Sequence, residues 1–173
     1  MRYFLQKDNR SCHIVAVKTI LSYYDEYPTT KEIKQLLTKH SFGNLITELA
    51  IYLEKKNMRT VLYSNGVKIS EKNKVLLDSI NEYSTYGKFI GRAPTEKELF
   101  HKPVLINVDW YKIRNKEIGQ GYHYVVALKE GSDLWLYDGS NYKRRVKTTF
   151  DKLYSASLDI NRGHDNGMWL IIE

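Results

Sequence analysis

Apolar residues recur every three or four positions through the first third of the chain, which is the spacing of a helix that buries one face. The pattern predicts helices at about residues 11–25, 30–41 and 44–57. Pro28 and the two threonines after it separate the first helix from the second, because proline cannot continue a helix and threonine can cap one. Three helices are therefore expected before most of the strands.

Runs rich in β-branched and aromatic residues dominate the rest of the chain. They predict strands at residues 58–63, 103–109, 122–128, 134–138 and 168–172. Between these strands the sequence indicates one or two helical turns at 95–100, a loop at 110–120 and a short helix at 149–154. Glu130-Gly131-Ser132-Asp133 predicts a hairpin turn at the centre of the sheet. This order, with helices first and a largely antiparallel sheet after them, is typical of an α+β domain.

Residues 65–92 have the least regular pattern. Apolar positions between 75 and 80 indicate a helix, and residues 84–91 indicate a loop that ends in glycine and proline signals. A chain of 173 residues is long enough to bury one core and short for two. We therefore expect a single domain over residues 1–173, with residues 65–92 as a candidate insertion.

The only cysteine, Cys12, stands at the predicted start of the first helix, after the polar residues Asp8, Asn9 and Ser11 that can cap it. Unpaired backbone N–H groups and the positive end of the helix dipole favour an anion there, so the thiol pKa falls and the thiolate becomes a nucleophile. Gln6, six positions upstream, is near enough to help hold an oxyanion. One cysteine cannot form an internal disulfide or a multi-thiolate zinc site.

A thiolate nucleophile needs a base, and the base needs a third group that fixes its tautomer. His123 begins the strongest predicted strand, and Asp138 ends the next strand, 15 positions later (138 − 123). In a hairpin that turns near Gly131, the start of one strand lies beside the end of the other. The spacing therefore predicts that His123 and Asp138 meet at one edge of the sheet.

Each of these residues also has an ordinary interpretation. A lone cysteine is more often a small buried hydrophobe, Asp138 can be a turn residue that bonds its own backbone, and Gln6 can be a surface amide. Four compatible residue types in three different elements favour a catalytic site instead.

The other histidines and the tryptophans carry weaker signals. His13 follows Cys12 directly and so points in another direction on the helix, and we expect it to be a wall of the cleft or a packed histidine. No metal site is expected, because the remaining histidines lack metal-ligand spacing and are predicted to lie at the surface; they are His40, His101 and His164. The tryptophans are predicted to belong to the core; they are Trp110, Trp135 and Trp169.

The chain resembles the papain-like cysteine peptidases, and within them the bacterial branch that includes the double-glycine leader peptidases of bacteriocin exporters. The resemblance rests on seven features: Gln6 six residues before Cys12, the helix ending in Tyr23-Tyr24, the 29–37 helix, Gly43-Asn44-Leu45, Pro103-Val104-Leu105-Ile106, His123-Tyr124-Val125-Val126 and Asp138-Gly139. It implies a papain-like fold and hydrolysis of a peptide or protein substrate without a cofactor. It also implies that Cys12 is the nucleophile, His123 the general base and acid and Asp138 the orienting residue, while Gln6 and the Cys12 backbone N–H form the oxyanion hole. The family usually has glycine where this chain has His13.

Two other functions are compatible with the same fold. An acyl transferase or amide-forming enzyme would share the fold and the thioester and differ only in the acceptor. A non-catalytic peptide-binding homologue would have a blocked cleft or a displaced Gln6.

Charge and hydropathy bear on partners and location. The formal net charge is +7, but the basic residues are dispersed and carry no nucleic-acid motif, so no specific nucleic-acid partner is expected. No segment approaches the ~20 apolar residues that a bilayer span needs, and residues 1–6 lack the apolar core of a secretory signal. A cytoplasmic location is the default expectation.

Overall fold

The computed structural model describes residues 1–7, 11–37, 45–64, 74–99, 102–115, 121–140, 145–158 and 167–173, and of residues 36, 37 and 74–76 the backbone alone. The predicted helices of the N-terminal part are confirmed as α1 (Cys12–Tyr23), α2 (Thr30–Leu37) and α3 (Leu45–Lys55). The predicted end of the second helix and the Asn44 cap of the third lie outside the described residues. No helix among the described residues is both long and apolar enough to cross a membrane.

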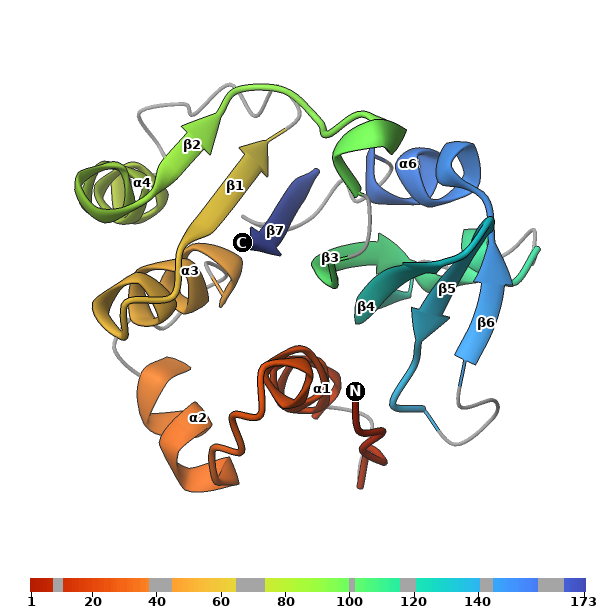
Figure 1. Cartoon of the computed structure of the whole chain (residues 1–173), viewed down its shortest axis with the longest axis horizontal. Helices are drawn as coiled ribbons and strands as arrows, with labels where there is room; N and C mark the ends of the chain where they lie inside the picture. Colours follow the sequence, from red (N-terminus) through yellow and green to blue (C-terminus); the bar gives the residue numbers. More distant parts are fainter. Residues whose placement is uncertain are drawn as a thin grey trace.

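Within the part of the chain that the structure describes, seven strands form one sheet in the order β2-β1-β7-β3-β4-β5-β6 (Figure 1). In that order they are β2 (Lys88–Ile90), β1 (Thr60–Ser64), β7 (Met168–Ile172), β3 (Val104–Asp109), β4 (Tyr122–Glu130), β5 (Asp133–Tyr137) and β6 (Arg145–Thr148). Among the strand pairs of the described residues, only β1–β2 is parallel. The α+β prediction is confirmed, and helices followed by this mostly antiparallel sheet are consistent with the papain-like fold.

Helices cover both faces of the sheet (Figure 1). The strand β7 shows why: Leu170 packs in the cluster of α1 and α3, whereas its neighbour Trp169 packs in the cluster that contains Leu153 of α6 (Phe150–Leu158). Successive side chains of a strand point to opposite faces, so a strand buried on both sides must be apolar at every position. All five residues of β7 are buried, which accounts for its uninterrupted apolar sequence.

The prediction of a loop at residues 84–91 is wrong. The helix α4 (Lys74–Tyr86) continues to Tyr86, and β2 follows it and forms an edge of the sheet. The buried Tyr83 hydroxyl donates to the backbone oxygens of Thr60 and Lys88, each at 2.9 Å, and so ties α4 to β1 and β2. These contacts are remote in sequence, and a local pattern does not reveal them. That the segment is an insertion in a single domain stays a prediction.

Two smaller predictions also need correction. Residues 110–113, expected in a loop, form the one-turn helix α5 (Trp110–Ile113), whose first turn is capped by the Asp109 carboxylate accepting the Tyr111 N–H at 3.0 Å. The strand β6 was not expected, and it pairs with β5 from Leu134↔Thr148 to Tyr137↔Arg145. Residues 116–120 of the predicted loop lie outside the described residues.

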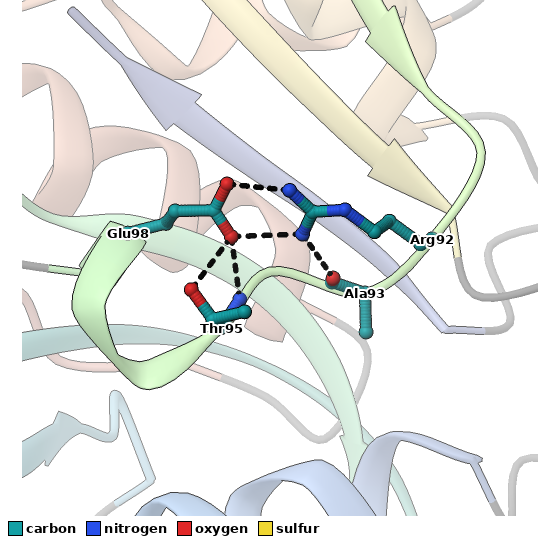
Figure 2. Close-up of polar contacts among 4 residues, drawn as sticks. All are labelled: Arg92, Ala93, Thr95 and Glu98. Carbon is teal, nitrogen blue, oxygen red and sulfur yellow. Dashed lines mark hydrogen bonds and ion pairs between the residues drawn. The ribbon is translucent and has the colours of Figure 1, made fainter.

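The helical turn expected at residues 95–100 is confirmed as the 3-10 helix η2 (Glu96–Leu99). The Glu98 carboxylate accepts the Thr95 backbone N–H at 2.7 Å and the Thr95 hydroxyl at 2.8 Å (Figure 2). Arg92 donates to both carboxylate oxygens, at 2.8 and 2.7 Å. The carboxylate thus makes one half of a capping box, reinforced by a two-bond arginine pair, while the Glu98 N–H donates to the Thr95 carbonyl at 3.0 Å.

Candidate active site

Cys12 is the first residue of α1, as predicted, and is half-buried. The helix is held in place by its apolar residues, of which Val17 and Ile20 are almost completely buried. The expected cap from Ser11 is wrong, because its side chain makes no capping hydrogen bond; Asp8 and Asn9 lie outside the described residues. The thiol therefore stands at the N-terminus of a buried helix, where backbone N–H groups without a partner in the helix and the helix dipole favour an anion.

His123 and Asp138 are brought together by the β4–β5 hairpin. His123 is the second residue of β4, opposite Val108 of β3, and Asp138 follows the last residue of β5. His123 Nε2 lies 2.5 Å from Asp138 Oδ1. Only 7% of His123 and 1% of Asp138 is exposed, so solvent screens this pair poorly.

Ser140 holds the same carboxylate, and the sequence reasoning did not include it. Its backbone N–H donates to Asp138 Oδ1 at 2.7 Å, and its hydroxyl donates to Asp138 Oδ2. The turn interpretation of Asp138 predicts the backbone contact, because an aspartate side chain can bond its own backbone two residues on, but it does not predict the hydroxyl contact. The turn interpretation of Asp138 and its contact with His123 therefore both apply.

Trp110 lies against the other side of the site. Its ring centroid is 4.9 Å from that of His123, with the planes at 51°. Its backbone N–H donates to the Gly121 carbonyl at 2.7 Å, which fixes the start of α5 beside the start of β4. The expectation of a core residue is thus incomplete for Trp110, because its half-buried ring also covers the imidazole.

The thiol and the imidazole shift each other's ionisation. Burial raises the pKa of Cys12, but hydrogen bonds from His123, His13 and the Tyr124 backbone outweigh it and lower the pKa from 9.0 to about 6. Burial lowers the pKa of His123, but hydrogen bonds to Asp138 and Cys12 outweigh it and raise the pKa from 6.5 to about 9. Between these two values the favoured state is a thiolate beside an imidazolium.

His13 interacts directly with the thiol, a contact that the sequence reasoning missed. Its hydrogen bond to the Cys12 side chain is among the causes that lower the thiol pKa, after the hydrogen bond from His123. His13 is half-buried, and its role as a wall of the cleft or a packed histidine stays a prediction. The thiol thus has two imidazole neighbours, of which only His123 has a carboxylate partner at hydrogen-bond distance among the described residues.

The N-terminal segment is attached to the Asp138 loop. The Gln6 backbone N–H donates to the Gly139 carbonyl at 2.7 Å, and the Tyr3 hydroxyl donates to the Asp138 carbonyl at 2.6 Å. A Cβ atom on Gly139 would lie 2.3 Å from Val15 Cγ1, so only glycine allows the loop to approach α1 this closely. Gln6, the Asp138 loop and α1 therefore share one junction.

The described residues contain no group of three or more His, Cys, Asp or Glu side chains that could hold a metal ion. The predicted surface positions of His40, His101 and His164 lie outside the described residues. The chemistry of the assembled groups is that of a thiol, an imidazole and a carboxylate in series, which can exchange protons and activate sulfur.

Comparison with known proteins bears on the first half of the chain. Residues 1–80 match the family model described as the Peptidase C39 family. This region contains Gln6 and Cys12 and ends before His123 and Asp138. A search of curated proteins gave no match. Over residues 1–80, with Cys12 at the start of its first helix, the chain is thus similar to the Peptidase C39 family.

Proposed function

We propose that the protein is a cysteine peptidase in which Cys12 is the nucleophile, His123 the general base and acid and Asp138 the orienting residue. The observation that carries this proposal is the buried His123–Asp138 contact of 2.5 Å beside a thiol whose pKa is lowered to about 6. The match of residues 1–80 to the Peptidase C39 family supports peptide hydrolysis as the reaction.

The contacts suit each step of acyl transfer. Because His123 Nε2 faces Asp138, the other ring nitrogen, Nδ1, is left for the thiol. The thiolate attacks the carbonyl carbon and forms the C–S bond, while the imidazolium donates its proton to the departing amine as the C–N bond breaks. Neutral His123 then takes a proton from water, the hydroxide attacks the thioester, and the carboxylic acid leaves as the thiolate is restored.

Gln6 and the Cys12 backbone N–H are proposed to donate to the oxyanion that forms in each attack. Cys12 begins α1, so its N–H has no partner within the helix. Gln6 is tied through its backbone to Gly139, directly after Asp138, which supports a position near the reacting groups. Removal of one oxyanion donor typically lowers kcat by about 10² to 10³.

A peptide or protein is the proposed substrate, in keeping with the Peptidase C39 family. The resemblance to double-glycine leader peptidases makes a peptide with paired glycines before the cleaved bond the first substrate class to examine. A narrow subsite would admit glycine and reject a residue with a Cβ atom.

The test is to follow cleavage of fluorogenic peptides with Gly-Gly, Gly-Ala and Ala-Ala before the reporter, together with the pH dependence of Cys12 alkylation by iodoacetamide. We expect cleavage of the Gly-Gly peptide by the wild type and none by Cys12→Ala. We expect His123→Ala to lose cleavage and to return the alkylation midpoint towards ~8.5, the value of a free thiol. His13→Ala is the comparison variant: it also removes an imidazole that lowers the thiol pKa, so it should raise the alkylation midpoint less than His123→Ala does and should keep cleavage.

Two outcomes would contradict the proposal. A wild-type thiol that titrates near ~8.5, with no effect of His123→Ala, would show that the site does not activate sulfur. An acyl-enzyme that forms but reacts faster with an added amine than with water would indicate an acyl transferase instead.

A further inference from the structure

We propose that Ser140 is a positioning residue whose hydroxyl holds the Asp138 carboxylate in the orientation that His123 requires. The inference rests on the proposed function and extends it to a residue outside the triad and the oxyanion donors. It stands on the hydrogen bonds that meet at Asp138.

The two carboxylate oxygens of Asp138 have different partners. Oδ1 is shared by His123 Nε2 at 2.5 Å and the Ser140 backbone N–H at 2.7 Å. Oδ2 accepts from the Ser140 hydroxyl. A carboxylate held through one oxygen can still rotate about its Cβ–Cγ bond, and a donor on the second oxygen opposes that rotation. The hydroxyl therefore controls the direction in which Oδ1 meets the imidazole.

The Ser140 hydroxyl is not needed to close the turn. The backbone N–H of Ser140 already makes the two-residue turn contact that follows an aspartate. The chain around it is held by the Tyr3 hydroxyl, which donates to Asp138 O at 2.6 Å and to Ser140 O at 3.4 Å, and by the Gln6 N–H on Gly139 O. Because the loop has these other supports, its backbone can keep its course when the hydroxyl is removed.

Burial makes the loss of this hydroxyl consequential. Asp138 is 1% exposed, so water replaces a missing donor on its second oxygen poorly. A less well aligned carboxylate stabilises the imidazolium less, since a charge-assisted hydrogen bond depends on direction as well as distance. The effect of Ser140 is thus expected to reach the thiol only through Asp138 and His123.

The experiment compares wild type, Ser140→Ala and Ser140→Thr, with Ser84→Ala as the matched control. Ser84 is also a serine with a local hydrogen bond, to the Asn81 carbonyl, on the exposed side of α4. The readouts are the pKa of His123 from NMR of its ring protons and the rate of Cys12 alkylation at pH 7. In Ser140→Ala we expect the His123 pKa to fall by about one pH unit. Alkylation at pH 7 should slow about twofold, because a thiol pKa raised from about 6 by about one unit lowers the thiolate fraction from about nine-tenths to about one-half. Ser140→Thr, which keeps the hydroxyl, should restore most of both.

A second comparison separates positioning from general support of the fold. In an Asp138→Asn background, Ser140→Ala should change neither readout further, because the group through which it acts is already altered. Equal effects of Ser140→Ala in both backgrounds, or a His123 pKa that stays unchanged or rises in Ser140→Ala, would overturn the proposal. Thermal unfolding of each variant shows whether the fold is kept. If Ser140→Ala does not fold, the comparison of Ser140→Thr with the wild type tests whether a hydroxyl at this position is enough to keep the His123 pKa.

The NMR readout needs no substrate, so the two proposals can fail separately. A His123 pKa that falls in Ser140→Ala, in a protein that cleaves no peptide, would keep the role of Ser140 and reject the peptidase. Peptide cleavage by the wild type, with a His123 pKa that does not change in Ser140→Ala, would keep the peptidase and reject the role of Ser140.

Discussion

Two carboxylates in this protein have almost the same set of partners and very different surroundings. Glu98 accepts from the Thr95 N–H, the Thr95 hydroxyl and Arg92 (Figure 2). Asp138 accepts from the Ser140 N–H, the Ser140 hydroxyl and His123. The Glu98 side chain is 30% exposed and that of Asp138 is 2% exposed. The hydrogen-bond pattern alone therefore does not decide what a carboxylate does.

The nature of the cationic partner makes the second difference. An arginine keeps its proton at any ordinary pH, so the Arg92 pair holds the pKa of Glu98 well below its usual range and exchanges no proton. An imidazole can gain and lose a proton near neutrality, and the His123 ring is also hydrogen-bonded to the Cys12 thiol. The exposed cluster can cap a helical turn, whereas the buried one is suited to proton transfer.

The largest expected effect comes from replacing each carboxylate by its amide. Asp138→Asn should lower peptide cleavage by about tenfold or more, because the neutral amide can still accept the His123 N–H but stabilises the imidazolium less than a carboxylate does. Glu98→Gln should leave kcat/KM within about twofold, since η2 contributes no group to the site. Steady-state kinetics on the same fluorogenic peptide measure both, and a comparable loss in the two variants would show that the two carboxylates do not differ in their role in cleavage.

The pH dependence of the site gives the next test. Cys12 must lose its proton to attack, so activity should rise as the pH passes about 6. His123 must keep its proton for the leaving amine, so activity should fall as the pH passes about 9. The kcat/KM profile should thus be bell-shaped, with both limbs moved inward by Asp138→Asn and unmoved by Glu98→Gln. A single rising limb near the ordinary thiol pKa would contradict a preformed ion pair.

The smallest expected effect is that of the exposed pair on stability. Arg92→Gln should lower the melting temperature by about 2 °C or less, because an exposed ion pair contributes little and is screened by water. The difference should shrink further at high salt, where charges are screened within a few ångströms. Thermal unfolding at low and high salt checks this, and a large, salt-independent loss would show that the cluster supports more than a local turn.

Local patterns predicted the parts of this fold whose contacts are local. The helix start at Cys12 follows from the apolar period of residues 14–24. The approach of His123 and Asp138 follows from strand order, because one hairpin brings its two ends together. The course of α4 and β2 could not be predicted in this way, since the Tyr83 hydroxyl contacts that hold them connect separate elements.

By itself the sequence determined the reactive residue types, the helix that presents Cys12 and the hairpin that pairs His123 with Asp138. Only the tertiary structure decided that α1, from the N-terminal half, packs against β4 from the C-terminal half, so that the thiol and the imidazole share a hydrogen bond. It also decided which neighbours surround them: Trp110 against the imidazole, His13 beside the thiol and Ser140 on the carboxylate. The physical reason is that periodicity reports which face of an element is buried, whereas the partner on that face depends on how distant elements pack.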